Sequence, residues 1–312
     1  MTAPTPPPYR FKFGMFLNEL RLPFEEALAA ARDIGADAVW FDHLEGWPEL
    51  AELGEAQVER VGDTLGRYGL QVFLLSPRSP FKFLHLTDLQ LDTLPDHPIV
   101  RKERGELVRA MRMAHRLNAG AVLAYTCAWP GEYTAAKPTW PMRWLTRGGV
   151  MSDLDLDKLT RLLALSLEDA ERHDVDLVLA MMPWNYTNTT SNFRIVAERL
   201  GSKRLKVMWG PADNFNCGEW DVATTGLTNV RPYLHSLHLK DLHVIDGLHL
   251  KFEYRPIGTG DVDYRQILRS LRDHGSQAIL SVATHFLPPS GSRVEAMRTN
   301  FANLQALIDA LP

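Results

Sequence analysis

The sequence predicts an α/β fold, a single (β/α)₈ barrel, from three observations. Short β-like runs alternate with longer helix-like segments eight times. Several runs are continuously apolar, as in Leu177–Met181, which is typical of strands buried on both faces of a parallel sheet. No Gly-x-Gly-x-x-Gly follows the first run and no Walker loop occurs, which disfavours an open doubly wound sheet. The candidate strands, in order, are Phe11–Phe16, Ala38–Asp42, Gln71–Ser76, Ala121–Tyr125, Leu177–Met181, Leu205–Trp209, Ser236–Lys240 and Ala278–Val282.

The segments between these runs have helical spacing. Apolar residues recur every three or four positions from Val294 to Leu311. Asp263 with Gln266 forms a capping-box pattern, and Gly275 stands where a helix commonly ends on glycine. The stretch Cys127–Val150 is long for a strand-to-helix connection and rich in aromatic residues, so we expect a lid or an interface there.

Composition indicates one domain, residues 10–312, preceded by a proline-rich disordered tail, residues 1–9. The chain has 312 residues, of which 45% are hydrophobic, enough for one barrel core. The net charge of −4 gives no reason to expect a nucleic-acid partner. Apolar runs are only strand-sized, so we expect no membrane span.

The cysteines and the N-terminus favour a reducing compartment. Cys127 and Cys217 are far apart and have no ligand spacing, which excludes a disulfide framework. The first eight residues hold four prolines and no basic residue, unlike a secretory signal. We therefore expect a cytoplasmic protein.

Three stretches carry a resemblance to a known family. They are His238–Asp241 followed by Arg255–Tyr264, then Val207–Asp213, and Ile279–His285. They resemble the xylose isomerase-like TIM barrel superfamily, which includes sugar-phosphate isomerases and epimerases and barrel-type AP endonucleases. The likeness is strong from about residue 177 to residue 285, and upstream it rests on the strand–helix rhythm.

This resemblance implies a metal site that the chain has lost. In the family a Glu, an Asp, a His and a Glu at the ends of strands five to eight bind one divalent ion. The strand-seven position is His238, but the other three fall on Ala180, Gly210 and Ala283. Alanine and glycine side chains offer no donor to a divalent ion, so we expect no metal and no other cofactor. A relocated site formed by Asp213, His238 and His285 is the alternative.

Titratable residues at the predicted strand ends are candidate acids and bases. Polar side chains there usually face the active site of such barrels. His238 is the principal candidate, and its counterpart would come from Asp42 and His43 after strand two or from His285 after strand eight.

Further strand-end residues are candidates for substrate binding. Lys240 or Arg255 would stabilise oxyanion charge in place of the metal. The structural alternative for Lys240 is an ion pair with Asp241. Other candidate contacts are Arg78, Tyr125, Trp184, Asn185 and Asp213.

The leading functional hypothesis is a metal-independent isomerase, epimerase or lyase that acts on a small hydroxy-carbonyl or polyol-type substrate by proton transfer. The alternative is a non-catalytic subunit or ligand-binding barrel, which the lost ligands would also explain. A DNA-repair nuclease is disfavoured because the chain lacks the many zinc ligands of that branch and has no excess of basic residues. The expected partner is a small molecule, and homo-oligomerisation stays open.

Overall fold

Eight parallel strands close into a barrel, which confirms the predicted fold. The computed structural model describes residues 9–78, 80–130, 149–247, 249 and 251–312. Residues 1–8 of the expected tail and 131–148 of the expected lid lie outside the described residues. Around the barrel the order is β1 (Phe13–Phe16), β10 (Ile279–Val282), β7 (Leu234–Leu239), β6 (Leu205–Trp209), β5 (Asp176–Ala180), β4 (Ala121–Ala124), β3 (Gln71–Leu75) and β2 (Ala38–Phe41).

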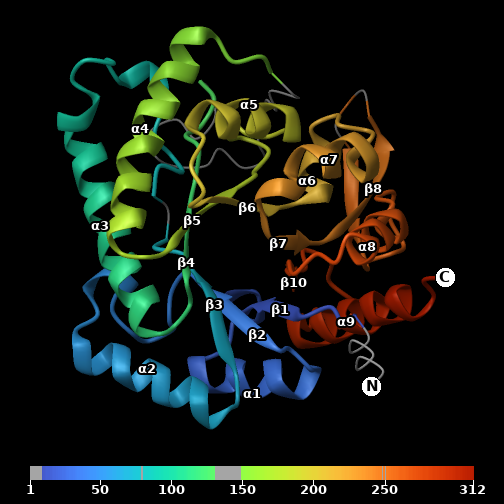
Figure 1. Ribbon diagram of the computed structural model, residues 1–312. Coiled ribbons are helices and arrows are strands. Elements are labelled where there is room, and N and C mark those ends of the chain that lie inside the picture. Colours follow the sequence, from blue (N-terminus) through green and yellow to red (C-terminus); the bar gives the residue numbers. More distant parts are fainter. Residues whose placement is uncertain (1–8, 79, 131–148, 248, 250) are drawn as a thin grey trace, which may run out of the picture.

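Helices surround the strands (Figure 1). The last helix packs beside the first strand, where the rings of Phe13 and Phe301 are 5.7 Å apart, so both ends of the barrel chain meet. The helices are α1 (Phe24–Ile34), α2 (Glu55–Arg67), α3 (Pro98–Arg116), α4 (Asp153–Arg172), α5 (Thr190–Leu200), α6 (Pro211–Asn216), α7 (Leu227–Val230), α8 (Tyr264–Asp273) and α9 (Arg293–Asp309).

The predicted cap of α8 is confirmed. The Asp263 carboxylate accepts a hydrogen bond from the Gln266 backbone N–H at 3.0 Å. Gly275, just past the helix, has a φ of +63°, a left-handed conformation that glycine adopts without steric cost.

The strands alternate between two cores. Side chains such as Trp40, Tyr125, Ala180 and Met208 fill the barrel interior, while their neighbours pack outward against the helices. This alternation follows from the two-residue period of a strand. It means that the residues at positions 180, 210, 238 and 283 all belong to the inward-facing rows.

A two-stranded antiparallel hairpin, β8 (Asp241–Asp246) with β9 (Lys251–Arg255), follows β7 and was not predicted. The Asp241 carboxylate fixes its base by accepting backbone N–H groups from Leu242, Gly258 and Gly260 at 2.8–3.0 Å. A Cβ at Gly260 would overlap that carboxylate, so the glycines serve a tight turn. Asp241 is thus committed to the hairpin and does not pair with Lys240.

Within the described part of the chain, no helix is long and apolar enough to cross a membrane. Both cysteines, Cys127 and Cys217, are buried thiols that are not joined in a disulfide, as the sequence predicted.

Candidate active site at the carboxyl ends of the strands

A cavity of about 450 Å³ opens at the carboxyl ends of the barrel strands. Barrels of this class place their active sites at this face, because the loops after the strands converge there. The residues that line the cavity are Phe16, Glu19, Trp40, Asp42, Lys82, Tyr125, Met182, Pro183, Trp184, Asp213, Asn216, His238, Lys240, Phe252, Tyr254 and His285.

Seven of the eleven predicted site residues line this cavity, namely Asp42, Tyr125, Trp184, Asp213, His238, Lys240 and His285. The other four, which do not line it, are His43, Arg78, Asn185 and Arg255. The sequence missed four polar lining residues, Glu19, Lys82, Asn216 and Tyr254.

A buried ion pair lies at the centre of the site. The Lys240 Nζ is 2.9 Å from the Asp213 Oδ2, and both side chains are less than a tenth exposed. Asp213 lies in the first turn of α6, which begins directly after β6. Burial alone would lower the pKa of Lys240, but the Asp213 carboxylate and Tyr254 raise it above its usual value. The pair with Asp213 therefore favours the ammonium form of Lys240 inside the barrel mouth.

Asp213 occupies the space that a side chain at position 210 would need. A Cβ built on Gly210 would lie 2.6 Å from the Asp213 Oδ2, inside normal contact distance. The glycine at the end of β6 thus lets a carboxylate from α6 reach the inward-facing row. That carboxylate is neutralised by Lys240.

The residues present do not fit the family's divalent ion. Ala180 and Ala283 are fully buried and have no donor atom. Among the described residues, no group of three or more His, Cys, Asp or Glu side chains could hold a metal. The arrangement therefore gives no support to the alternative site at Asp213, His238 and His285.

His238 projects into the cavity from β7 and is 6% exposed. Its ring packs edge-on against Trp40, with centroids 6.0 Å apart. Within the described chain, its Nδ1 has no hydrogen-bond partner. Burial, followed by the charge of Lys240, holds the pKa of His238 well below 6.5. The imidazole is consequently neutral near pH 7.

Glu19 is a largely buried carboxylate of the cavity, with a side chain 11% exposed, that the sequence analysis did not select. Its Oε2 is 3.1 Å from the Arg293 Nη1, and its Oε1 is 3.9 Å from the His285 Nδ1. Burial raises the pKa of Glu19, although Arg293 and Lys240 oppose the shift. The available signal was its place just after the first strand, in Leu17-Asn18-Glu19.

His285 connects Glu19 to the hairpin. Its ring centroid is 4.7 Å from that of Tyr254 on β9. Burial, with help from Lys240 and Arg293, lowers the pKa of His285 to about 3, so this imidazole is also neutral.

Arg255 faces away from the cavity because it follows Tyr254 by one residue on a strand. Neighbouring side chains on a strand point to opposite faces. Arg255 instead pairs with Glu253 on the exposed face of the hairpin. The residue predicted to contact substrate from this segment is thus replaced by Tyr254.

The other three residues outside the cavity have identifiable local roles. The His43 Nδ1 lies 2.6 Å from the Asp42 Oδ1, so His43 orients the carboxylate that does line the cavity. Arg78 is 67% exposed and pairs with Glu49 at the surface. Asn185 is buried and donates its amide N–H to the Cys127 carbonyl at 2.7 Å, which fixes the loop after β4.

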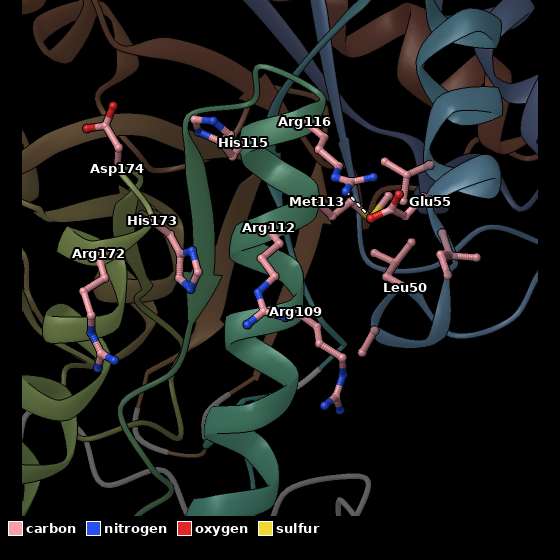
Figure 2. Close-up of a pocket in the computed structure, with 13 residues that line it drawn as sticks. Leu50, Glu55, Arg109, Arg112, Met113, His115, Arg116, Arg172, His173 and Asp174 are labelled. Carbon is pink, nitrogen blue, oxygen red and sulfur yellow. Dashed lines mark hydrogen bonds and ion pairs between the residues drawn. The ribbon is translucent and has the colours of Figure 1, made fainter.

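A second hollow, of about 520 Å³, lies along α3 on the outside of the barrel (Figure 2). Arg109, Arg112 and Arg116 project from α3 around it, and Arg116 is paired with Glu55. None of its lining residues directly follows a barrel strand. We therefore take the cavity at the strand ends as the candidate active site.

Solved structures similar to this one are barrels of the same kind. A xylose isomerase domain protein from Planctomyces limnophilus has a TM-score of 0.67 and 16% identity over 97% of this chain and 98% of its own. The probable 3-DHS dehydratase AsbF of petrobactin synthesis from Bacillus anthracis has a TM-score of 0.70 and 14% identity, over 94% and 98%. The 3-keto-D-glucoside 4-epimerase from E. coli has a TM-score of 0.68 and 16% identity, over 95% and 100%.

No curated protein matches the chain in sequence. The family model described as xylose isomerase-like TIM barrel, in contrast, matches residues 28–306, nearly the whole barrel. This match covers every barrel strand except β1, and it includes the positions where the ligand residues are missing. The chain belongs to the xylose isomerase-like TIM barrel family.

Proposed function

We propose that the protein is an enzyme that moves a proton at a carbon next to the carbonyl of a small hydroxy-carbonyl or polyol-type substrate, without a divalent metal. The reaction class is isomerisation, epimerisation or elimination. The family match supports enzymatic activity on sugars, and similar structures include two epimerases and a probable dehydratase. The observation that carries the metal-free proposal is the Lys240–Asp213 pair beside Gly210.

Lys240 would supply the positive charge that a metal supplies elsewhere. Removing a proton next to a carbonyl moves an electron pair onto the carbonyl oxygen, and the resulting enediolate needs a nearby cation or donor. The Lys240 ammonium is fixed by Asp213 and is shielded from water. A preorganised charge in such a site costs little reorganisation during the reaction.

Glu19 is the best candidate for the base that takes the proton from carbon. A carboxylate with a raised pKa is a stronger base than an exposed one, and burial raises the pKa of Glu19. His238, kept neutral, would donate an N–H to the substrate oxygen, since its low pKa makes it a weak base. Glu19, protonated in this step, would then return that proton to the other carbon or to the leaving group, and Asp42 or His285 would relay a proton from solvent where the reaction needs a second donor.

A non-catalytic ligand-binding barrel is the second candidate. Ala180, Gly210 and Ala283 favour it, since the family's reaction centre has been removed at these positions. In that case the buried pair would only stabilise the barrel. Binding of a sugar without any proton exchange at carbon would identify this function.

The test is exchange of carbon-bound hydrogen with D₂O, followed by NMR over a panel of keto sugars and hydroxy-ketones in the presence of EDTA. We expect exchange with the wild type, and a loss of about 10²–10³-fold in Lys240→Met. Glu19→Gln should show a comparable loss. Lys203→Met, an exposed lysine before β6, is the matched control and should behave as wild type. Exchange that appears only when Mn²⁺ or Mg²⁺ is added would contradict metal independence.

A further inference from the structure

A second lysine, Lys82, lines the same cavity from the connection after β3. Its Nζ lies over three aromatic rings, 5.0 Å from the ring centroid of Tyr125, 5.5 Å from that of Phe83 and 5.6 Å from that of Trp184. Aromatic faces attract a cation, but they do not neutralise its charge. Lys82 therefore presents an ammonium group to the cavity from the side of β3, β4 and β5.

Lys82 differs from Lys240 in having no counter-ion. In the described part of the chain, no carboxylate lies within ion-pairing distance of the Lys82 Nζ, whereas the Asp213 Oδ2 lies 2.9 Å from the Lys240 Nζ. Asp42 lines the cavity and acts on Lys82 only through the field of its charge. Burial lowers the pKa of Lys82, because water solvates a buried ammonium less fully than an exposed one. A negative group brought by a ligand would remove this penalty.

The backbone holds Lys82 in place at some conformational cost. Phe81, directly before it, is fully buried and has a φ of +65°, an uncommon conformation for an aromatic residue. Its N–H donates to the Glu103 Oε2 at 2.5 Å. The Tyr125 N–H donates to the Pro80 carbonyl at 3.0 Å, and the Ala128 N–H to the Leu84 carbonyl at 2.9 Å. A left-handed residue held by such bonds is typical of functional segments.

We propose that Lys82 binds an anionic group of the substrate, and that this group is a carboxylate. The substrate class is then a sugar acid or another hydroxy-carbonyl acid, placed with its carboxylate at Lys82 and its reacting carbons near Lys240. A carboxylate fits better than a phosphate ester, because a single monovalent cation without a counter-ion lines this side of the described cavity. This inference rests on the proposed function for the placement of the reacting carbons.

The experiment measures binding, so it does not depend on turnover. Isothermal titration calorimetry would compare D-glucuronate with D-glucose, and D-gluconate with D-glucitol, on the wild type, Lys82→Met, Lys82→Arg and the control Lys203→Met. A hydrogen bond to a charged group contributes about 1.5–3 kcal/mol, so the wild type should bind each acid roughly tenfold or more tightly than its neutral partner. Lys82→Met should abolish that preference, Lys82→Arg should retain most of it, and Lys203→Met all of it.

Three results would overturn the inference. They are equal affinity of the wild type for acids and neutral sugars, a preference that survives in Lys82→Met, and the absence of binding by either acid. Tighter, Lys82-dependent binding of D-glucose 6-phosphate would overturn the assignment to a carboxylate. Failure of the proposed function is read separately, as carboxylate-selective binding without hydrogen exchange at carbon.

Discussion

The two lysines of the cavity stand in opposite electrostatic situations. Lys240, on the side formed by β6, β7, β10 and β1, has a carboxylate 2.9 Å away and a raised pKa. Lys82, on the side formed by β2 to β5, faces aromatic rings and has a lowered pKa. In the free protein the charge of Lys240 is therefore compensated by a carboxylate, and the charge of Lys82 is not.

This difference suggests that the charge of Lys240 stabilises the folded protein, whereas the charge of Lys82 is available to bind a ligand. A buried pair is costly to break, because its remaining partner is left without compensation. A buried charge without a counter-ion destabilises the free protein and is compensated on binding. We therefore expect the two halves to respond to mutation with different magnitudes and, for the lysines, with different signs.

The largest expected effect is the contrast between Lys240→Met and Lys82→Met in stability. Lys240→Met leaves Asp213 buried without its partner and should lower the free energy of unfolding by about 3–5 kcal/mol. Lys82→Met removes an uncompensated charge and should leave stability unchanged or raise it by up to about 1 kcal/mol. Urea denaturation of both variants at pH 7 would measure this. Equal losses of stability in the two variants would contradict the claim that only Lys240 has a compensating partner.

The next effect concerns Glu103, which holds the segment of Lys82. Burial raises the pKa of Glu103 from 4.5 to about 7, outweighing the Phe81 N–H that favours the charged form. Because the folded state raises this pKa, the stabilisation is complete below pH 4.5 and is lost as the pH rises through about 7. The loss amounts to about 3 kcal/mol at most.

Glu103→Gln keeps an acceptor for Phe81 and removes the titration. Between pH 5 and pH 8 the free energy of unfolding should fall less in this variant than in the wild type. The difference between the two falls should be about 3 kcal/mol. Denaturation series at several pH values would show it. Parallel curves for the two proteins would mean that Glu103 titrates normally.

A smaller effect is expected at Gly210 on the Lys240 side. Gly210→Ala places a methyl group against the Asp213 carboxylate and should cost about 1–3 kcal/mol. The matched control is Gly66→Ala in α2, where the new methyl group meets nothing within 4 Å and should stabilise by about 0.5–1 kcal/mol. If the two variants have the same melting temperature, the close contact at position 210 is not significant.

The smallest expected effect concerns a hydrogen bond that joins the Lys82 side of the barrel to the Lys240 side. The Trp40 Nε1 donates to the Ser281 Oγ at 2.9 Å, across the barrel interior. Trp40→Phe leaves this hydroxyl without its donor and should cost about 1 kcal/mol. It should also change the affinity for sugars, since Trp40 lines the cavity. Calorimetric unfolding and binding would measure both, and unchanged values would show the two sides to be independent.

The sequence predicted the barrel strands well because their signal is local. A buried parallel strand is a short apolar run, and every predicted strand lies within two residues of the observed one at each end. The inward positions Ala180, Gly210, His238 and Ala283 followed from the same pattern combined with the family resemblance. The order of apolar runs and the alternation of inward and outward positions can be read directly from one sequence.

The site residues that were missed depend on information that is not local. Lys82 reaches the cavity because Phe81 turns the chain in a left-handed conformation. An aromatic residue rarely adopts this conformation, so the sequence gives no signal for it. Tyr254 was missed in favour of Arg255 because the hairpin was not predicted, and an error of one residue reverses the face of a strand. Lys240 and Asp213 were each selected, but their pairing across two elements was not foreseen, since Asp241 is the nearer carboxylate in sequence.

The hairpin β8–β9 forms one side of the cavity and is attached to the barrel at its base. Its base is fastened to the end of β7 through Asp241, one residue after Lys240, while its far end carries Lys251 and Glu253 on the outer face. The inner face contributes Phe252 and Tyr254 to the cavity. Exchange of the hairpin, with Asp241, Tyr254 and the glycine turn kept, would therefore alter which molecules are admitted while leaving the Lys240–Asp213 pair in place.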